Sequence, residues 1–295
     1  MPELPEVETI KQELNNTVIG KKIKAVDVFL PKIINVSPPE FKKKLSGTIV
    51  KNVERRAKNL IITISRNRRE TINLPLQADR VHAKDENLYL LVHLKMTGQL
   101  IYIQNNSINI KNKYTHIIFN FTDGSKLLFN DLRQFGYIKL LNDNELSAYL
   151  DKQNFGYEPL ENNFTSDKLK DLLRGKKGKI KVMLMDQTFL SGIGNLYAAE
   201  ICFYAKINPA RQISTLTDTE TENLYLGIKK ILTDAIKHKG SSIENYVDIY
   251  GKKGGFVPFL KVYNRKGKKC YRCGSIIQAI KLGGRGTYFC HNCQR

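Results

Sequence analysis

Near its C-terminus the chain reads CYRCGSIIQAIKLGGRGTYFCHNC, from residue 270 to residue 293, and this stretch dictates the local fold. Two C-x2-C pairs stand 16 residues apart, a spacing that lets four thiolates surround one zinc ion as a tetrahedron. A site with four protein ligands has no open position for a reactive water, so we predict one structural zinc ion. Its ligands are Cys270, Cys273, Cys290 and Cys293.

Two other residues of ligand type are expected to have different roles. Cys202 lies in the apolar run AEICFYAKI and fits core packing. His291 stands inside the second cysteine pair and is the less favoured ligand.

The first twenty residues carry acids and prolines where a secretory signal has basic and apolar residues. We therefore expect an intracellular protein without disulfides.

Positive charge gathers at the same end of the chain. The whole chain has 48 Lys and Arg against 28 Asp and Glu, a formal net charge of +20. Residues 249–295 contain eleven Lys and Arg and no Asp or Glu, with aromatic residues between them. This composition favours contact with a phosphate backbone over a basic tail that only keeps the protein soluble. No apolar run approaches the roughly 18 residues of a spanning helix, so a membrane partner is not expected.

The part of the chain after residue 141 has helical periodicity. We predict three helices, over residues 167–174, 195–204 and 218–238. Ser166 is the expected N-cap of the first helix. The segment 241–261 has glycines, a proline and weak periodicity, which predicts a long mobile loop.

Residues 22–141 have the pattern of strands. Short β-branched and aromatic runs separated by turns predict a β-sandwich or a barrel. Asp123 and Gly124 mark a hairpin turn, and the polar, basic segment 66–87 is an insertion between strands. The predicted strands cover residues 22–30, 48–56, 59–65, 87–94, 99–104, 114–121, 126–130 and 137–141.

The N-terminus begins MPELPEVETI. Pro5 near a helix start, acids in the first turn and an apolar stripe predict a helix over 3–14 with an exposed N-terminal end. Cytosolic processing removes an initiator methionine that precedes a small residue. Without Met1, Pro2 carries a secondary amine and is a potential nucleophile.

Other motifs bring cations or glycines to loops. SGIGN at 191–195 opens a helix whose free N–H groups bind an anion or allow tight packing. Lys58 precedes an apolar strand. HLKMTG at 93–98 and DLRQFG at 131–136 each hold an apolar side chain suited to fill a gap in a base stack or to pack in a core. Arg285 stands between glycines, which favours phosphate binding.

In the same order along nearly the whole chain, these motifs resemble the formamidopyrimidine-DNA glycosylase family. The matching motifs are PELPEVET, RRAK, HLKMTG, DLRQFG, SGIGNLYAAE, the length of the loop from 240 to 262 and the final cysteine pairs. The resemblance implies an α+β, multidomain fold with DNA in the cleft between the domains. It implies an N-terminal helix and β-sandwich at 1–142, a helix-two-turn-helix domain with a lesion-recognition loop at 143–261 and a zinc-finger β-hairpin at 262–295.

The resemblance also implies a reaction. Members of this family excise oxidised purines, such as 8-oxoguanine and formamidopyrimidines, from duplex DNA and then cleave the abasic strand. Pro2 would attack C1′ of the damaged nucleotide, and Glu3 would act as general acid/base. Glu6 would support the site, and Lys58 would hold a phosphate and assist proton transfer.

Further residues match the DNA contacts of the family. The void left by the flipped base would be filled by Met96, Arg133 and Phe135. The phosphate contacts would be His93, Asn195 and Arg285. Lys181 corresponds to a lysine of 8-oxoguanine processing, whereas Gln134 replaces a common arginine and puts one phosphate contact in doubt. The expected partner is double-stranded DNA with oxidised bases or abasic sites, bound by a monomer with one zinc ion.

Two alternatives remain open. An endonuclease VIII-like enzyme that prefers oxidised pyrimidines would share the proline chemistry, although PELPE and the void-filling residues favour the purine branch. A non-catalytic lesion-binding protein would share the scaffold, although Pro2, Glu3 and Lys58 are intact. A zinc deaminase is excluded, because no histidine belongs to an H-x-E motif.

Overall fold

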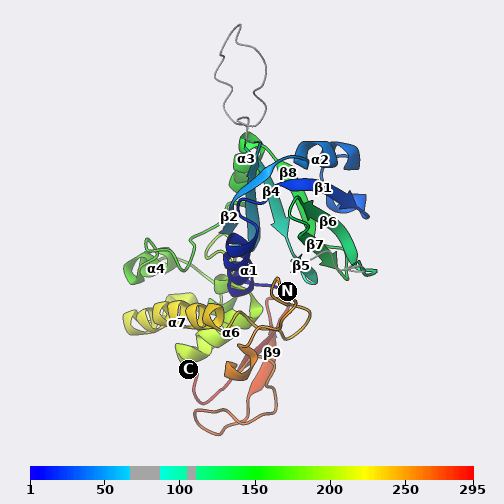
Figure 1. Ribbon diagram of the computed structural model, residues 1–295. Coiled ribbons are helices and arrows are strands. Elements are labelled where there is room, and N and C mark those ends of the chain that lie inside the picture. Colours follow the sequence, from blue (N-terminus) through cyan, green and yellow to red (C-terminus); the bar gives the residue numbers. More distant parts are fainter. Residues whose placement is uncertain (67–86, 105–110) are drawn as a thin grey trace, which may run out of the picture.

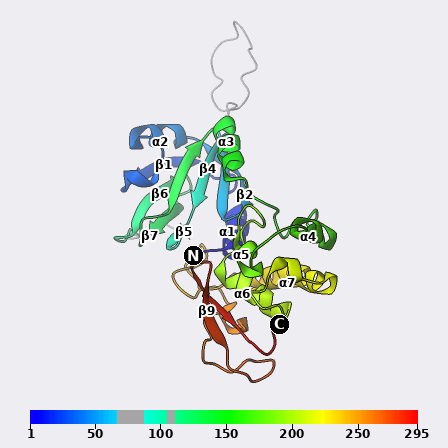
Figure 2. The ribbon, with the colours of Figure 1, turned by 180° about the vertical axis from the view of Figure 1, so that it is seen from behind.

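The computed structural model describes residues 1–66, 87–104 and 111–295. The predicted insertion at 66–87 lies outside the described residues except for its two end positions. Three parts follow one another from top to bottom in Figure 1: a β-sandwich, a group of helices and a C-terminal hairpin. The N-terminus lies where these parts meet, in this view and in the opposite view of Figure 2.

The sandwich consists of two four-stranded antiparallel sheets. One sheet has the order β2-β3-β4-β8, and the other has the order β1-β6-β7-β5. All eight predicted strands are confirmed, and so is the hairpin turn at Asp123 and Gly124 between β6 and β7. The strands are β1 (Ile23–Val28), β2 (Ile49–Arg56), β3 (Asn59–Ser65), β4 (Leu88–His93), β5 (Gly98–Ile103), β6 (Thr115–Phe121), β7 (Lys126–Asp131) and β8 (Tyr137–Leu141).

The two sheets share one apolar core because side chains alternate between the faces of a strand. On β3, Leu60 and Ile62 point into this core, whereas Ile61 points outward and packs beside α3 (Asp143–Gln153). Helix α2 (Pro38–Leu45) and the short 3-10 turn η1 (Pro31–Ile33) close other sides of the same core.

The helical part confirms the predicted helices. They are α4 (Ser166–Leu173), α6 (Asn195–Tyr204) and α7 (Asp218–Lys237), accompanied by α5 (Ile180–Met185) and the turn η3 (Ile213–Thr215). The predicted cap of α4 is wrong by one residue. Thr165 accepts the hydrogen bond from the Lys168 amide at 3.2 Å, so Ser166 is the first helical residue. Cys202 is fully buried among these helices, as predicted.

Helix α1 (Leu4–Thr17) joins the two large parts. Leu4 is buried in the core of the helical part, whereas Val7 and Ile10 are buried in the core of the sandwich. The predicted exposed N-terminal end of this helix is therefore wrong. Its first turn is enclosed, because the Leu4 amide donates to the Gly192 carbonyl at 2.9 Å across the domain boundary.

The chain ends in the predicted β-hairpin, formed by β9 (Gln278–Leu282) and β10 (Arg285–Phe289). Ile277 and Cys290 pack against Phe203 of α6, so the hairpin is held to the helical part. The only regular element among residues 241–261 is the turn η4 (Val257–Phe259), so the long loop is confirmed and its mobility stays a prediction.

Candidate active site and DNA-binding surface

A pocket of about 380 Å³ lies where the sandwich, the helices and the hairpin meet. Its wall combines α1, the β2–β3 turn, the start of α6, the 241–246 segment and the tip of the hairpin. Pro2 and Lys58, which the sequence placed in catalytic roles, both line it. The other predicted residues in its wall are Glu3, Glu6, Met96, Asn195 and Arg285.

Glu3 occupies the start of helix α6. Its carboxylate accepts hydrogen bonds from the amides of Gly194 at 2.8 Å, Leu196 at 3.0 Å and Tyr197 at 3.3 Å. The free N–H groups at the start of α6, one of them from the SGIGN turn, therefore hold a protein carboxylate. Because Glu3 follows Pro2 directly, this contact also fixes Pro2 in the pocket wall.

Two glycines of SGIGN make this approach possible. A Cβ on Gly194 would lie 2.4 Å from the Glu3 carboxyl carbon, and one on Gly192 would lie 2.8 Å from Leu4 Cβ. Gly192 also has a φ of +88°, which a side chain disfavours. These glycines serve close packing of α1 on α6, which was one of the two roles expected for them.

Glu6 is buried and takes three hydrogen bonds. Its Oε1 accepts from the Tyr197 hydroxyl at 2.5 Å and from the Ser241 amide at 2.8 Å, and its Oε2 accepts from the Glu3 amide at 2.8 Å. Burial raises the pKa of Glu6 to about 7, and the negative charge of Glu3 adds to the effect. Glu6 thus links the N-terminal end of α1 to α6 and to the 241–246 segment.

Lys58 is held in place through its neighbours in the β2–β3 turn. Glu158, from the helical part, binds Arg55 at 2.7 Å and Arg56 at 2.9 Å and accepts the Ala57 amide at 2.6 Å. Ala57 has a φ of +55°, a strained value that this contact stabilises. The Arg pair of the RRAK motif is therefore structural.

The pKa of the Lys58 ammonium group depends on its position in the pocket. Burial lowers the pKa of Lys58 below its usual value, and the guanidinium of Arg285 adds to this, whereas Glu3 and Glu6 oppose it. A lysine with a lowered pKa can take up and release protons near neutral pH more readily than an exposed one. Among the described residues no hydrogen bond or ion pair engages its ammonium group.

His93 is neutral and lies outside the pocket wall. Its Nδ1 accepts the Lys95 amide at 2.9 Å, which puts the ring proton on Nε2. Burial lowers the pKa of His93 to about 3, and Lys95 and Lys58 add to the effect. His93 is therefore a hydrogen-bond donor through Nε2 and not a cation.

The two loop motifs of the sandwich come together in space. An Arg133 guanidinium nitrogen lies 2.9 Å from the Met96 sulfur, and the guanidinium stacks over the Phe135 ring at 4.9 Å. Phe135 is 56% exposed, which excludes the core-packing interpretation for this side chain. Buried Asp131 supports the group by accepting the amides of Arg133 at 3.2 Å and Gly136 at 2.7 Å.

Lys181 is buried and lies behind the pocket wall. Its ammonium group donates to Asn195 Oδ1 and, at 2.8 Å, to the Thr287 hydroxyl of the hairpin. Asn195 in turn donates to the Gly286 carbonyl at 3.1 Å. Burial lowers the pKa of Lys181 to about 8, with Arg285 adding to the effect. Lys181 thus positions Asn195 and the hairpin tip relative to each other.

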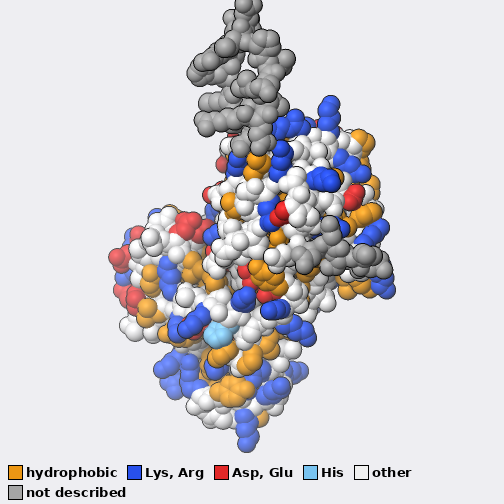
Figure 3. All heavy atoms as spheres, in the orientation of Figure 1, with side chains coloured by type: hydrophobic (Ala, Val, Ile, Leu, Met, Phe, Trp, Pro, Cys, Tyr) orange, Lys and Arg blue, Asp and Glu red, His pale blue; other side chains and the backbone are white. Residues whose placement is uncertain are grey.

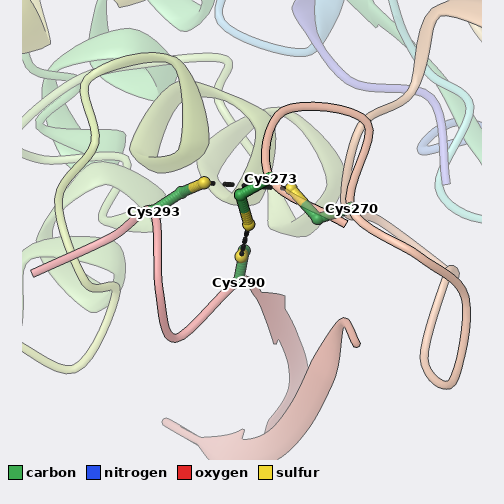
Figure 4. A group of neighbouring side chains, drawn as sticks. All are labelled: Cys270, Cys273, Cys290 and Cys293. Atoms are coloured by element: carbon green, nitrogen blue, oxygen red, sulfur yellow. Dashed lines mark hydrogen bonds between the residues drawn. The ribbon is translucent and has the colours of Figure 1, made fainter. Parts of the chain in front are cut away.

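The four predicted ligand cysteines converge at the base of the hairpin (Figure 4). Their sulfur atoms all lie within 4.8 Å of one another, with 3.9 Å between Cys270 and Cys293 and 3.4 Å between Cys273 and Cys290. A tetrahedron with Zn–S bonds of about 2.3 Å needs sulfur atoms about 3.8 Å apart. The site fits one structural zinc ion, and its four ligands are the predicted cysteines.

Family comparisons agree with this geometry. Residues 1–138 match the formamidopyrimidine-DNA glycosylase N-terminal domain, residues 155–247 match the H2TH domain of the same enzymes, and residues 267–295 match the zinc finger found in FPG and IleRS. The chain belongs to the formamidopyrimidine-DNA glycosylase family. The predicted α+β, multidomain fold with a helix-two-turn-helix domain and a zinc finger is therefore confirmed.

Individual relatives cover the whole chain. Formamidopyrimidine-DNA glycosylase of Pelotomaculum thermopropionicum is 40% identical over 297 residues, covering 100% of this chain and 99% of that protein. The enzyme of Carboxydothermus hydrogenoformans is 39% identical over 296 residues, with full coverage of both. A solved structure of a Lactococcus lactis FPG mutant with Fapy-dG containing DNA has 32% identity, full coverage of both chains and a TM-score of 0.85. The Lactococcus lactis Fpg complex with abasic-site DNA has 32% identity, 99% coverage of each chain and a TM-score of 0.84.

The surface near this pocket carries the positive charge that the sequence predicts for the C-terminal part of the chain. Figure 3 shows Lys and Arg gathered on the lower lobe, where the hairpin lies, and Asp and Glu on the helical side. Arg285 is exposed at the hairpin tip and lines the pocket. Within the described part of the chain, no helix has the length and apolar character needed to cross a membrane.

Sequence reasoning missed several residues of this family site. Tyr197, Ser241 and Glu158 were not predicted, although each contacts a predicted residue or its neighbours. Tyr197 stands in an apolar helical run, and Glu158 stands in an irregular segment, so neither has a local pattern that indicates its role.

Proposed function

We infer that this chain is a DNA glycosylase of base excision repair that removes oxidised purines, such as 8-oxoguanine and formamidopyrimidines, from duplex DNA and then cleaves the strand. One observation carries the inference. Pro2, whose nitrogen becomes a free amine when Met1 is removed, lines one pocket with Glu3, Glu6 and Lys58. An amine beside a carboxylate that can accept its proton is a nucleophile suited to attack on a sugar carbon.

The reaction begins when the damaged nucleotide leaves the base stack and its sugar enters the pocket. The Pro2 nitrogen attacks C1′, a C–N bond forms, and the glycosidic bond breaks as the base leaves with a proton. Because the amine is secondary, loss of its own proton and opening of the sugar ring give a cationic iminium ion. The buried carboxylates of Glu3 and Glu6 stabilise this cation.

Strand cleavage follows from the same intermediate. The iminium withdraws electrons from C2′, so a base removes a C2′ proton and the bond from C3′ to its phosphate oxygen breaks in β-elimination. A second elimination breaks the bond from C5′ to the other phosphate oxygen. Water then releases the sugar fragment and restores the Pro2 amine.

Each acidic or basic residue has a distinct place in this scheme. Glu3 is fixed by three amide donors, so its remaining lone pairs can exchange a proton with the sugar ring oxygen. Lys58, with its lowered pKa, binds a phosphate and assists proton transfer. Glu6 sets the position of Glu3 through the Glu3 amide.

The proposal extends to the DNA outside the pocket. Met96, Arg133 and Phe135 enter the space left by the flipped base, and the Arg133 guanidinium faces the orphaned cytosine. Phosphates contact His93 through Nε2 and the exposed Arg285. Pro2, Glu3, Glu6 and Lys58 line the same pocket of this chain, so the reaction needs no residue of a second copy, and we propose that the protein acts as a monomer. The four cysteines of the zinc site must stay reduced to bind the metal, which is typical of a reducing compartment and supports action inside the cell.

Borohydride trapping tests the proposal. Reduction of the iminium should leave a stable covalent complex with duplex carrying 8-oxoguanine opposite cytosine, and Pro2→Gly should weaken trapping strongly. Equal trapping by the variant contradicts the role of Pro2. Faster release of thymine glycol opposite adenine would favour the pyrimidine-preferring alternative. Full activity of a chain that retains Met1 would contradict the amine chemistry itself.

A further inference from the structure

Helix α1 carries a third buried carboxylate that reaches the helical part of the protein. Glu13 lies seven residues after Glu6, about two turns further along the same face of the helix. Its Oε2 accepts the Ile249 amide at 3.2 Å, just as Glu6 accepts the Ser241 amide at 2.8 Å. One face of α1 thus holds the segment 241–255 at two points.

The second carboxylate oxygen of Glu13 takes part in a network of two ion pairs, which joins Glu13, Lys239 and Asp248. Its Oε1 accepts from Lys239 Nζ at 2.7 Å, and this ammonium lies 3.5 Å from the buried carboxylate of Asp248. Asp248 accepts the amides of Tyr250 at 3.0 Å and Lys252 at 2.8 Å. Glu13 therefore connects Lys239, two residues before this segment, to the turn at residues 248–252 in its second half.

The same segment is also attached to the sandwich. The Ile249 carbonyl accepts the Tyr102 amide at 2.7 Å on the open edge of β5, and Ile249 and Tyr246 are buried in the sandwich core. The segment returns to the helical part where the Gly255 amide donates to the His238 carbonyl at 2.7 Å. These anchors leave residues 243–246 spanning the pocket wall.

In this arrangement, contacts with a base are distinct from contacts with the sugar that reacts with Pro2. Residues 243–246 line the pocket that also contains Pro2, so a base in this pocket has these residues as neighbours. An abasic deoxyribose has no base, and its reaction with Pro2 needs no contact with them. The position of the segment is therefore expected to matter for base release and to matter little for cleavage of an abasic strand.

We propose that Glu13 is a positioning residue for base excision: it fixes the segment 241–255 so that residues 243–246 receive the extruded base beside Pro2. This inference rests on the proposed function. Glu13 does not touch the reacting atoms and acts only through the segment that it anchors. No other carboxylate of α1 or its N-cap has this pair of contacts. Glu3 binds α6, Glu6 binds Tyr197 and the Ser241 amide, and Glu8 binds Arg55 and Lys11.

The test compares two reactions of the full-length protein with zinc bound. Single-turnover base release is measured on duplex with 8-oxoguanine opposite cytosine, and strand cleavage is measured on the same duplex with a preformed abasic site. Glu13→Gln should slow base release roughly 10- to 100-fold, because misplacement of a positioning group costs this much. Cleavage of the abasic duplex should change less than about threefold. Lys239→Met should shift the ratio of the two rates in the same direction.

A matched control separates positioning from stability. Glu220→Gln removes an ion pair with Arg211 near the start of α7, away from the pocket, and should leave the ratio unchanged. Hydrogen exchange of the free protein supplies a readout without activity. The amides of residues 249–252 should exchange faster in Glu13→Gln than in Glu220→Gln.

The outcomes distinguish the two proposals. An equal loss of both rates in Glu13→Gln, or no loss in either, overturns the positioning role, and so does unchanged exchange at 249–252. If the native protein and Lys239→Met both release no oxidised base, the proposed function fails, while the exchange data still decide whether Glu13 anchors the segment. Loss of both reactions is expected only for Pro2→Gly.

Discussion

The carboxylate of Glu3 lies 2.8 Å from the amide nitrogen of Gly194, although 191 residues separate them in the sequence. The contact places Glu3, which follows Pro2 directly, at the start of a helix from the helical part. Pro2 is thereby fixed in the pocket wall, where a free chain end would fray. The catalysis that we propose for a Pro2 amine would therefore depend on a domain interface as well as on the residues beside it.

Gly194→Ala should disturb this contact. The added Cβ would lie 2.4 Å from the Glu3 carboxyl carbon, so either Glu3 or the start of α6 must move. A shift of about 1 Å at the reacting groups costs about 100-fold in rate. We expect a loss of this size in single-turnover base release, with near-normal DNA affinity. Gly175→Ala is a stringent control, because nothing lies within 4 Å of a Cβ there but its φ of +72° disfavours a side chain, whereas the φ of Gly194 is −131°. Equal rates for the two variants would contradict the prediction.

Glu6 should make the protein less stable as the pH rises. Its pKa is raised from 4.5 to about 7, so the folded protein binds this proton more tightly than the unfolded chain does. The stabilisation is complete below about pH 4.5 and is lost as the pH rises through 7, a change of about 3 kcal/mol. Urea unfolding at several pH values between 5 and 8 measures it.

The control for this pH effect is the variant that removes the titrating group. Glu6→Gln should flatten the dependence of unfolding free energy on pH over this window. Glu220→Gln should keep the slope of the native protein, because the Thr217 amide and Arg211 lower the pKa of Glu220. A slope of the same size in Glu6→Gln would show that other groups cause it.

Cys290→Ser should release zinc and unfold the hairpin. Three remaining thiolates cannot close the tetrahedron, and Cys290 is also buried against Phe203. Because Arg285 and Gly286 belong to this hairpin, DNA affinity should fall at least tenfold. Metal analysis and a fluorescence binding assay measure both effects. Cys202→Ser, in the helical core, should retain the zinc, and unchanged zinc content in Cys290→Ser would refute the site.

Arg285→Ala should reduce the salt dependence of DNA binding. Each phosphate contact releases counterions and adds roughly 0.9 to the slope of log affinity against log salt concentration. Loss of one contact should lower the slope by about this amount on damaged and undamaged duplex alike. Met96→Ala removes an uncharged side chain of the same pocket and should leave the slope unchanged. Identical slopes for the native protein and Arg285→Ala would count against phosphate contact.

Much of the fold follows from local patterns. The strands were predictable because short β-branched and aromatic runs, such as residues 59–65 of β3, are separated by turns. Helix α7 was predictable from its apolar stripe. Helix α5, with six residues, and helix α3, with no buried residue, lack such a pattern and were not predicted.

The zinc site was predictable from the sequence alone. Two C-x2-C pairs at a suitable spacing are a metal-binding pattern, so all four cysteine ligands, from Cys270 to Cys293, could be named without a structure. The possible nucleophile was equally visible, because an amine at Pro2 depends only on the first two residues. The basic, acid-free C-terminal segment likewise indicated a polyanion as partner.

Only the tertiary structure decided how these groups are supported. Glu3 sits on the α6 amides, Glu158 holds the turn that carries Lys58, and Glu13 holds the Ile249 amide. Each of these contacts joins a side chain to a backbone amide more than a hundred residues away. A backbone N–H has no signature in the sequence, because every residue except proline has one. Which N–H a buried carboxylate meets is therefore set by how the domains pack and not by the pattern of either segment.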